Sequence, residues 1–195
     1  MEECYVALFF VFITVIQYVC MLSVDQKRRK LEKLRKMIER VWFYPEYEGV
    51  MGYYGTGPIM FVGLNPSTGI FPSKADEFLY KQLKKHRIKN SHITDLVKKR
   101  MANKEAEEYF EKHPKNQIKL LKEEIKVIRP KIVVAFGRKC HKHLKKAKIE
   151  NLALIMHYTH PFNRGRKHKT KNKNKFCRQL KEIKRNCMNR RCANE

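Results

Sequence analysis

This chain of 195 residues lacks closely spaced cysteine pairs of the C-x-x-C type. Structural zinc sites and thioredoxin-like redox motifs both depend on such pairs, so the spacing supports neither of them, and we expect no metal site. Scattered cysteines are typical of reduced thiols in a cytoplasmic protein. The six cysteines of the chain are Cys4, Cys20, Cys140, Cys177, Cys187 and Cys192.

Acidic residues are also scarce. Nineteen Asp and Glu stand against 44 Lys and Arg, which gives a formal net charge of +25. A lysine-rich thermophilic surface is an alternative explanation, but such surfaces usually carry matching Glu for ion-pair networks. The unmatched positive charge therefore favours a polyanionic partner, and nucleic acid is the first candidate.

Charged side chains are absent from residues 5–24, and this apolar run has about the length that spans a bilayer. The basic run at residues 27–30 follows at once and would hold the rest of the chain in the cytoplasm. No small-residue cleavage site is evident, so a secretory signal is not indicated. Alternatively, translation starts at Met21, and we favour this. Residues 1–24 are thus interpreted as an anchor or a mis-assigned start, ahead of a domain over residues 25–190.

Short apolar runs alternate with amphipathic segments through that domain. The runs predict strands over Ile59–Val62, His92–Val97, Ile132–Phe136 and Leu152–Met156. Helices are predicted over Asp25–Trp42, Ala75–His86, Lys104–Lys112, Asn116–Ile128, Gly137–Leu144 and Phe176–Asn189. This alternation predicts an α/β fold of three layers, with a central parallel sheet of about four strands between helices.

Polar residues follow the first and fourth predicted strands. Gly63-Leu64-Asn65-Pro66-Ser67 comes directly after the first, and His157-Tyr158-Thr159-His160-Pro161 comes after the fourth. Ligands of open α/β sheets bind at the carboxyl ends of the strands. Pro66 stiffens the turn, so Asn65 is held where it can face a substrate.

These strand ends resemble the active-site motifs of the uracil-DNA glycosylase superfamily. The stretch at residues 63–67 is similar to the G-x-N-P motif of the mismatch-specific and single-strand-selective branches, and Thr159-His160-Pro161 to the family's His-Pro motif. Residues 91–97 are similar to its T-N-x-V strand, and residues 131–137 to the strand before its Gly-led helix. The similarity covers roughly residues 45–185.

The resemblance implies a glycosylase of base excision repair that flips uracil or a related damaged base out of DNA and releases it by hydrolysis. It implies DNA as partner, a flipped base as ligand, and a monomer. Some branches hold an iron–sulfur cluster through four cysteines, but the cysteine spacing here does not match theirs, so we expect no cofactor.

The resemblance assigns catalytic roles to Asn65 and His160. Asn65 would position the attacking water, and His160 would donate a hydrogen bond to O2 of the departing base, where negative charge develops. Alternatively, Asn65 caps its turn and His160 is one of several surface histidines. His157 is the alternative donor.

The remaining pocket residues would determine which base is bound. Gly63, Leu64 and Pro66 belong to the first motif, and Phe71 is the candidate for stacking on the base; Phe78 fits the helix core better. Ser67 stands where the strict uracil branch has a bulky Tyr, so the pocket would be permissive unless Ser67 is an ordinary turn residue. The list of substrate-binding candidates is Gly63, Leu64, Pro66, Ser67, Phe71, Asp95 and His157.

Asp95 departs from the Asn with which many family members read the base edge. An ionised carboxylate only accepts hydrogen bonds, whereas O4 of uracil needs a donor. A base with an exocyclic amine, or recognition by the main chain, would fit an acceptor better. Alternatively, Asp95 caps the following turn.

Residues 164–195 form a basic C-terminal region. Thirteen Lys and Arg and one acid, Glu182, lie within residues 164–191. In the family the loop after the His-Pro motif enters the DNA groove, so Phe162 or Arg164 is the candidate wedge, and Arg166 and Lys167 would contact phosphates. A solvated tail is the alternative, and such a tail can order on binding.

Three functions therefore compete. The first is a DNA glycosylase, and the second is a nucleic-acid-binding protein of the same fold without glycosylase activity. The third is a membrane-tethered domain, which rests on residues 5–24 alone.

Overall fold

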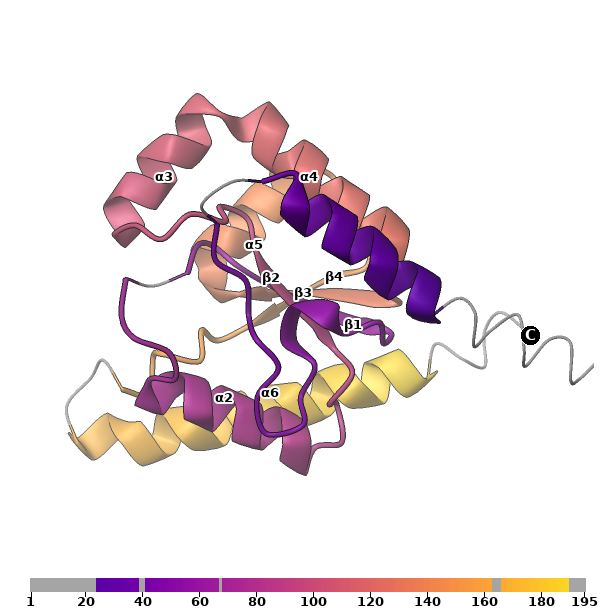
Figure 1. Cartoon of the computed structure of the whole chain (residues 1–195). Coiled ribbons are helices and arrows are strands. Elements are labelled where there is room, and N and C mark those ends of the chain that lie inside the picture. The colour runs from indigo at the N-terminus through magenta and orange to yellow at the C-terminus, as the bar shows by residue number, and fades with distance from the viewer. Residues whose placement is uncertain (1–23, 39–40, 67, 163–165, 190–195) are drawn as a thin grey trace, which may run out of the picture.

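The computed structural model of the chain describes residues 24–38, 41–66, 68–162 and 166–189, with the side chains of residues 166–168 left out (Figure 1). Residues 1–23, most of the apolar segment, lie outside this part of the chain. So do Ser67, Arg164 and the side chains of Arg166 and Lys167. Within the described ranges, no helix is long and apolar enough to cross a membrane.

The central sheet has four parallel strands in the order β2-β1-β3-β4. Their bounds are β1 (Ile59–Gly63), β2 (His92–Asp95), β3 (Ile132–Phe136) and β4 (Leu152–Ile155). The prediction of a parallel sheet with about four strands is confirmed, with strand ends that differ from the expected ones by at most two residues.

Helices cover both faces of the sheet (Figure 1). One face carries α2 (Lys74–Lys85) and α6 (Arg166–Asn189), and the other carries α3 (Asn103–Lys112), α4 (Pro114–Ile128), α5 (Gly137–Lys146) and the helical residues 24–36. A short 3-10 helix, η1 (Gly52–Tyr54), precedes β1. The predicted three-layer arrangement is thereby confirmed.

The two faces of the sheet explain why its strands are apolar throughout. Alternate residues of a strand point to opposite faces. Phe61 of β1 packs with Leu79 of α2 and Leu180 of α6, whereas its neighbour Met60 packs with Leu121 of α4 on the other face. Every residue of β1 is buried, as expected for a strand covered on both sides.

Two helix predictions were wrong in their bounds. The first helix ends at residue 36, not Trp42, and Met37, the next residue, is 79% exposed. The aromatic run that ends in Tyr44-Pro45 is extended. Pro45 contributes to this, because a proline disfavours the helical conformation in the residue before it. Conversely, α6 begins at Arg166, ten residues before the expected Phe176. Its buried side chains anchor it on the core, and lysine is a good helix former, so the helix extends backward.

Candidate active site

The first and second strands deliver their motifs to the same place. Gly63, the last residue of β1, pairs with Asp95, the last residue of β2. The contact continues past the strands, since the amide of Leu96 donates to the carbonyl of Gly63 at 2.9 Å and that of Val97 to Leu64 at 2.8 Å. The turn with His160 follows β4, and all four strands are parallel. Asn65, Asp95 and His160 therefore lie at the carboxyl edge of one sheet.

Gly63 is required by its approach to Asp95. A Cβ atom at this position would lie 2.1 Å from Oδ1 of Asp95, closer than any real contact of two such atoms. A larger residue at position 63 would displace the Asp95 carboxyl group. Gly63 thus sets the position of a polar side chain at the site.

Asn65 is 9% exposed, and its amide group is oriented by the main chain around it. Nδ2 donates to the carbonyl oxygen of Met101 at 2.8 Å and to that of Pro66 at 3.0 Å. Oδ1 is buried and has no hydrogen-bond partner among the described residues. Asn65 could therefore both cap its turn and position a water molecule. Nδ2 stabilises the turn, and Oδ1 has no partner in the described part of the chain.

The turn after β4 holds two histidines in different states. The amide of His160 donates to the carbonyl of His157 at 3.0 Å, which closes the turn. Nδ1 of His157 accepts from the amide of Thr159 at 3.3 Å and lies 2.8 Å from the Thr159 hydroxyl. Nδ1 of His160 is buried and has no partner within the described ranges. The two histidines therefore differ at Nδ1, which is engaged in His157 and unpartnered in His160.

The protonation of His157 follows from its burial. Burial lowers the pKa of His157 to about 4, with a further lowering by His160 and an opposing effect of Asp76. His157 is therefore neutral at neutral pH, with its proton on Nε2 because Nδ1 accepts. His157 can therefore stabilise the turn, but it has no positive charge with which to bind a ligand.

Asp95 is 4% exposed, and its Oδ1 also has no hydrogen-bond partner in the described part of the chain. Burial raises the pKa of Asp95 to about 7. Lys98 and the nearby Tyr44 hydroxyl lower this pKa, and Glu124 and Asp76 raise it further. Near neutral pH, both the neutral acid and the carboxylate are populated, so Asp95 can act as a donor or as an acceptor.

Aromatic side chains form a wall beside the first motif. Phe71 is half-buried, and its ring centre lies 5.9 Å from that of Trp42, 5.6 Å from Tyr47 and 5.7 Å from Tyr80. A cavity of about 10 Å³ remains there, with room for about one water molecule. Its lining residues are Trp42, Tyr44, Pro66, Gly69, Phe71, Asp76, Arg100 and Tyr158. A base would enter only if part of this wall moved.

A chain of hydroxyl groups connects the elements behind this wall. The hydroxyl oxygens of Tyr44 and Tyr158 are 3.3 Å apart, and the Tyr158 hydroxyl donates to Oδ1 of Asp76 at 3.2 Å. Asp76 also caps α2, because its Oδ2 accepts from the amide and hydroxyl of Ser73 at 2.9 and 2.7 Å. The first residues of α2 are thereby fixed to the turn that carries His160.

A family comparison agrees with this geometry. The sequence model described as the uracil DNA glycosylase superfamily matches residues 51–184, more than half of the chain. The chain belongs to the uracil-DNA glycosylase superfamily. A comparison with curated proteins finds no match. Membership in this superfamily implies DNA as the substrate and a function of the DNA glycosylase type.

Some residues near the glycosylase motifs could not be found from single motifs. The Ser73–Asp76 capping box was visible as Ser-x-x-Asp before an apolar-periodic helix, and it would have drawn attention to Asp76. Trp42, Tyr44, Arg100 and Tyr158 had no such pattern. They meet only because the chain before η1, the loop after β2 and the turn after β4 converge.

The buried ion pair next to this glycosylase-like site was also not predicted. Lys98 is 3% exposed, and Nζ donates to Oε2 of Glu124 at 3.0 Å, to the Thr94 hydroxyl at 2.5 Å and to the carbonyl of Asp95 at 2.8 Å. Burial raises the pKa of Glu124, but Lys98 and His92 outweigh this and lower it. The pair joins α4 to the end of β2, and so supports Asp95 from behind.

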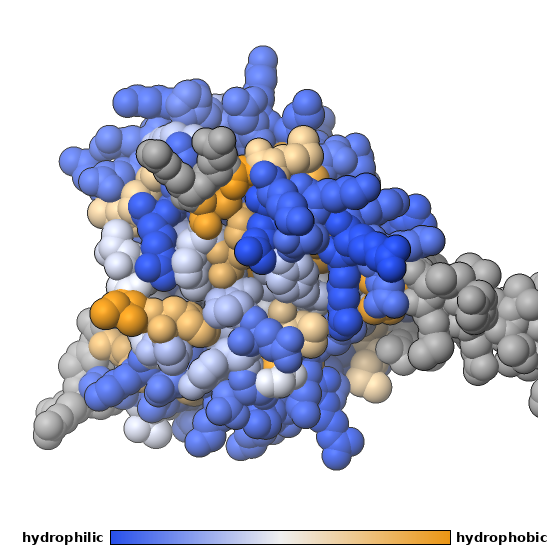
Figure 2. Space-filling view, in the orientation of Figure 1, coloured by the Kyte–Doolittle hydropathy of each residue, from blue (hydrophilic) through white to orange (hydrophobic). Residues whose placement is uncertain are grey.

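The proposed DNA-binding residues are only partly within the described chain. Phe162 is half-buried; its ring centre lies 5.8 Å from that of Phe78 and 5.2 Å from Nζ of Lys173. This packing restrains it against α2 and α6, and its role as a wedge stays a prediction. Phe78 in turn contacts Phe176, which agrees with its assignment to the core. The face in Figure 2 is covered mostly by hydrophilic side chains, as the net charge leads one to expect.

The described cysteines, Cys140, Cys177 and Cys187, do not gather in one place. Cys140 of α5 packs in the core, where its Sγ lies 3.3 Å from the carbonyl of Val62, and Cys187 of α6 packs on the opposite face of the sheet. Among the described residues, no three His, Cys, Asp or Glu side chains are grouped so that they could hold a metal ion. Cys4, Cys20 and Cys192 lie outside the described residues.

Proposed function

We propose that this chain is a monofunctional DNA glycosylase that flips uracil or a related damaged base out of DNA and releases it by hydrolysis. One observation carries the proposal. Three buried polar atoms at the carboxyl edge of the sheet have no partner among the described residues: Oδ1 of Asn65, Oδ1 of Asp95 and Nδ1 of His160. Each costs about 1–3 kcal/mol when it stays unpaired, so a ligand that satisfies all three explains why they are kept.

Asn65 would act on the attacking water. Its Oδ1 accepts a hydrogen bond from the water and holds it below the sugar, while Nδ2 stays on the Met101 carbonyl. An amide is too weak to serve as a general base. The bond from base to sugar therefore breaks first and leaves its electron pair on the base, and the cation-like sugar then takes the water oxygen. The water proton is lost to solvent.

His160 would act on the departing base. A proton on Nδ1 donates to O2 of the base, where negative charge grows as the bond breaks. Because the Nδ1 atom is already buried and oriented by the turn, little reorganisation is needed at the moment of reaction. His157 supports this turn and stays neutral.

Asp95 would read the base edge opposite the sugar. As a neutral acid it donates to O4 of uracil, and as a carboxylate it accepts from an exocyclic amine. Its pKa of about 7 makes the two forms comparable near neutrality. The departure from Asn is therefore compatible with uracil below pH 7 and favours amine-bearing bases above it.

An assay of base release tests the proposal. DNA strands with a single uracil, hypoxanthine or mismatched base are incubated with the protein, and abasic sites are detected by alkaline cleavage. We expect release from at least one of these, with loss of release in Asn65→Ala and His160→Ala. Matched controls are Asn116→Ala, on the exposed surface of α4, and His86→Ala, at the end of α2 away from the carboxyl edge. DNA binding without release from any strand would favour the nucleic-acid-binding alternative.

A further inference from the structure

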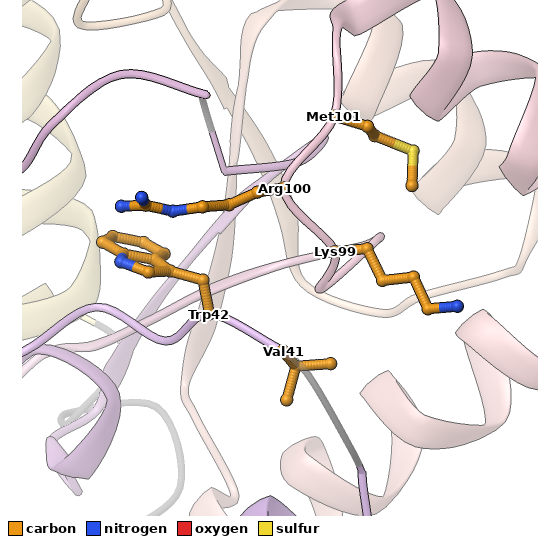
Figure 3. Close-up of a pocket in the computed structure, with 5 residues that line it drawn as sticks. All are labelled: Val41, Trp42, Lys99, Arg100 and Met101. Carbon is orange, nitrogen blue, oxygen red and sulfur yellow. The ribbon is translucent and has the colours of Figure 1, made fainter.

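A second hollow lies beside the base site and has no assigned role. It has a volume of about 390 Å³, within the range of small-molecule sites, roughly 300–1,000 Å³. Its lining residues come from two segments, the extended chain before η1 and the loop after β2. They are Val41, Trp42, Lys99, Arg100 and Met101 (Figure 3).

The hollow adjoins the candidate active site. Trp42 and Arg100 also line the small cavity beside Phe71, so these two side chains separate the two spaces. The main-chain carbonyl of Met101 accepts from Nδ2 of Asn65 at 2.8 Å. The amide of Trp42 donates to the carbonyl of Lys98 at 3.0 Å, which fixes one segment to the other.

The side chains in the hollow combine an aromatic ring with two cations. The guanidinium carbon of Arg100 lies 5.2 Å from the ring centre of Trp42, and Figure 3 shows Arg100 extended over that ring while Lys99 points the opposite way. Nζ of Lys99 lies 4.9 Å from the ring centre of Tyr109. Neither cation has an acidic partner among the described residues.

A planar aromatic surface beside unpaired cations is suited to a nucleotide. Bases stack on aromatic rings in proteins that bind single strands, and lysine and arginine contact the phosphates. A guanidinium group stacked on an indole occupies the place that a base would take, and it can move to a phosphate when a base arrives.

We propose that this hollow binds the nucleotide next to the flipped one on the same strand, with its base on Trp42 and its phosphate at Arg100 and Lys99. The proposal rests on the proposed function, in that the strand must already lie across the carboxyl edge. Displacement of Arg100 from Trp42 also removes one wall of the small cavity, so that binding of the neighbouring nucleotide opens the space that a flipped base needs.

The test uses Trp42 as its own reporter, because it is the single tryptophan of the chain. Two short single strands are compared. Both carry a stable abasic analogue at the target position, so the base pocket stays empty in both. The first has thymines on either side of it, and the second has abasic analogues there as well. We expect the first strand to quench Trp42 fluorescence, and the second to bind without quenching.

Variants locate the contact further. By fluorescence anisotropy of labelled strands, Trp42→Leu should weaken binding of the thymine-flanked strand about tenfold, and Trp42→Phe should retain most of it. Arg100→Ala and Lys99→Ala should each weaken it about threefold. Lys115→Ala, an exposed lysine of α4, is the matched control and should leave it unchanged. Circular dichroism checks the folding of each variant.

The outcomes separate this inference from the proposed function. Equal quenching by the two strands, or none, would overturn the nucleotide site even if the protein releases bases. Quenching by the thymine-flanked strand alone, in a protein that releases no base, would leave the site standing and remove the glycosylase. Weak binding by Trp42→Phe as well as Trp42→Leu, with normal folding, would also contradict stacking.

Discussion

Two buried polar clusters meet at the end of β2, and they differ in charge and in their place on the sheet. In one, Lys98 donates to Glu124, to Thr94 and to the main chain, so a buried charge meets its opposite. In the other, Asn65, Asp95 and His160 each keep a buried polar atom without a partner among the described residues. In the first cluster the charges balance, since Nζ of Lys98 lies 3.0 Å from Oε1 of Glu124, although both ring nitrogens of His92 beside it also lack a hydrogen-bond partner in the described part of the chain. The second cluster differs in its place, because its three unpartnered atoms lie at the carboxyl edge of the sheet, where the family motifs end. The difference teaches that an unsatisfied buried polar group points to a ligand site where it also lies at the carboxyl edge of the sheet.

The largest effect is expected when the ion pair between Lys98 and Glu124 is broken. Lys98→Met leaves Glu124 buried without its cation, and we expect the free energy of unfolding to fall by about 3–5 kcal/mol. Urea unfolding at pH 7 measures this. Lys126→Met is the matched control, because it removes an exposed ion pair with Glu123 on the same helix and should cost less than about 1 kcal/mol.

A double variant sharpens the interpretation of that loss. Lys98→Met combined with Glu124→Leu removes both charges, so most of the stability should return. If the double variant is less stable than Lys98→Met alone, the network stabilises the fold through more than the balance of its charges.

The next effect concerns the unpaired cluster and should appear in activity rather than in stability. Asn65→Ala and His160→Ala should each lower the rate of base release about 10²-fold, because each removes a group used in the transition state. The free energy of unfolding should fall by less than about 1 kcal/mol in His160→Ala, and by about 1–2 kcal/mol in Asn65→Ala, which also removes the two hydrogen bonds that Nδ2 donates. A loss of stability equal to that of Lys98→Met would mean that Asn65 and His160 serve mainly to stabilise the fold, as Lys98 does.

The sequence predicted the sheet and the strand ends of this site well, for a physical reason. Buried parallel strands must be apolar along their whole length, so Ile59–Val62 and Ile132–Phe136 stand out from any helix. Polar residues at their ends then fall on one edge by topology alone. Asn65 and His160 were accessible to such an argument because their positions depend on strand direction only.

The rest of the site depends on contacts between segments far apart in the chain. Trp42 was assigned to a helix, because its neighbours have helical spacing and only the extended chain before Pro45 places it beside Arg100. Lys98 looked like one lysine among many, and its burial is decided by Glu124, 26 residues later. The pKa of Asp95 likewise follows from how deeply the fold buries it, which no local pattern contains.

Asp95, the member of the second cluster at the end of β2, gives an effect that depends on pH. The carboxyl group has a pKa of about 7 in the folded chain, against 3.8 as its ordinary value. Below about pH 4 it is protonated in both states and costs nothing. As pH rises toward 7, the unfolded chain ionises first, so the folded state loses stability, and the loss levels off above pH 7.

Asp95→Asn removes this titration, and the variant should therefore be more stable than the parent by up to about 4 kcal/mol at pH 8 and nearly equal to it near pH 4. Thermal unfolding at both pH values measures the difference. Release of uracil by the parent should decline as pH rises through about 7, because the neutral donor is lost, while Asp95→Asn should show no such decline. Parallel pH profiles of the two proteins would mean that Asp95 does not contact the base.

The smallest effect tests charges that belong to neither cluster. Lys169 and Lys171 are exposed on α6, close to the turn that carries His160, and Lys115 and Lys119 are exposed on α4 across the sheet. If α6 contacts phosphates, Lys169→Gln with Lys171→Gln should reduce the slope of log K against log salt by about 0.9 for each contact on duplex DNA. Lys115→Gln with Lys119→Gln removes the same net charge and should leave the slope unchanged.

Equal changes in both pairs would mean that the protein attracts DNA by its net charge alone. Unfolding and base release at low salt should not differ between the two pairs, since exposed lysines without a buried partner hold neither cluster in place.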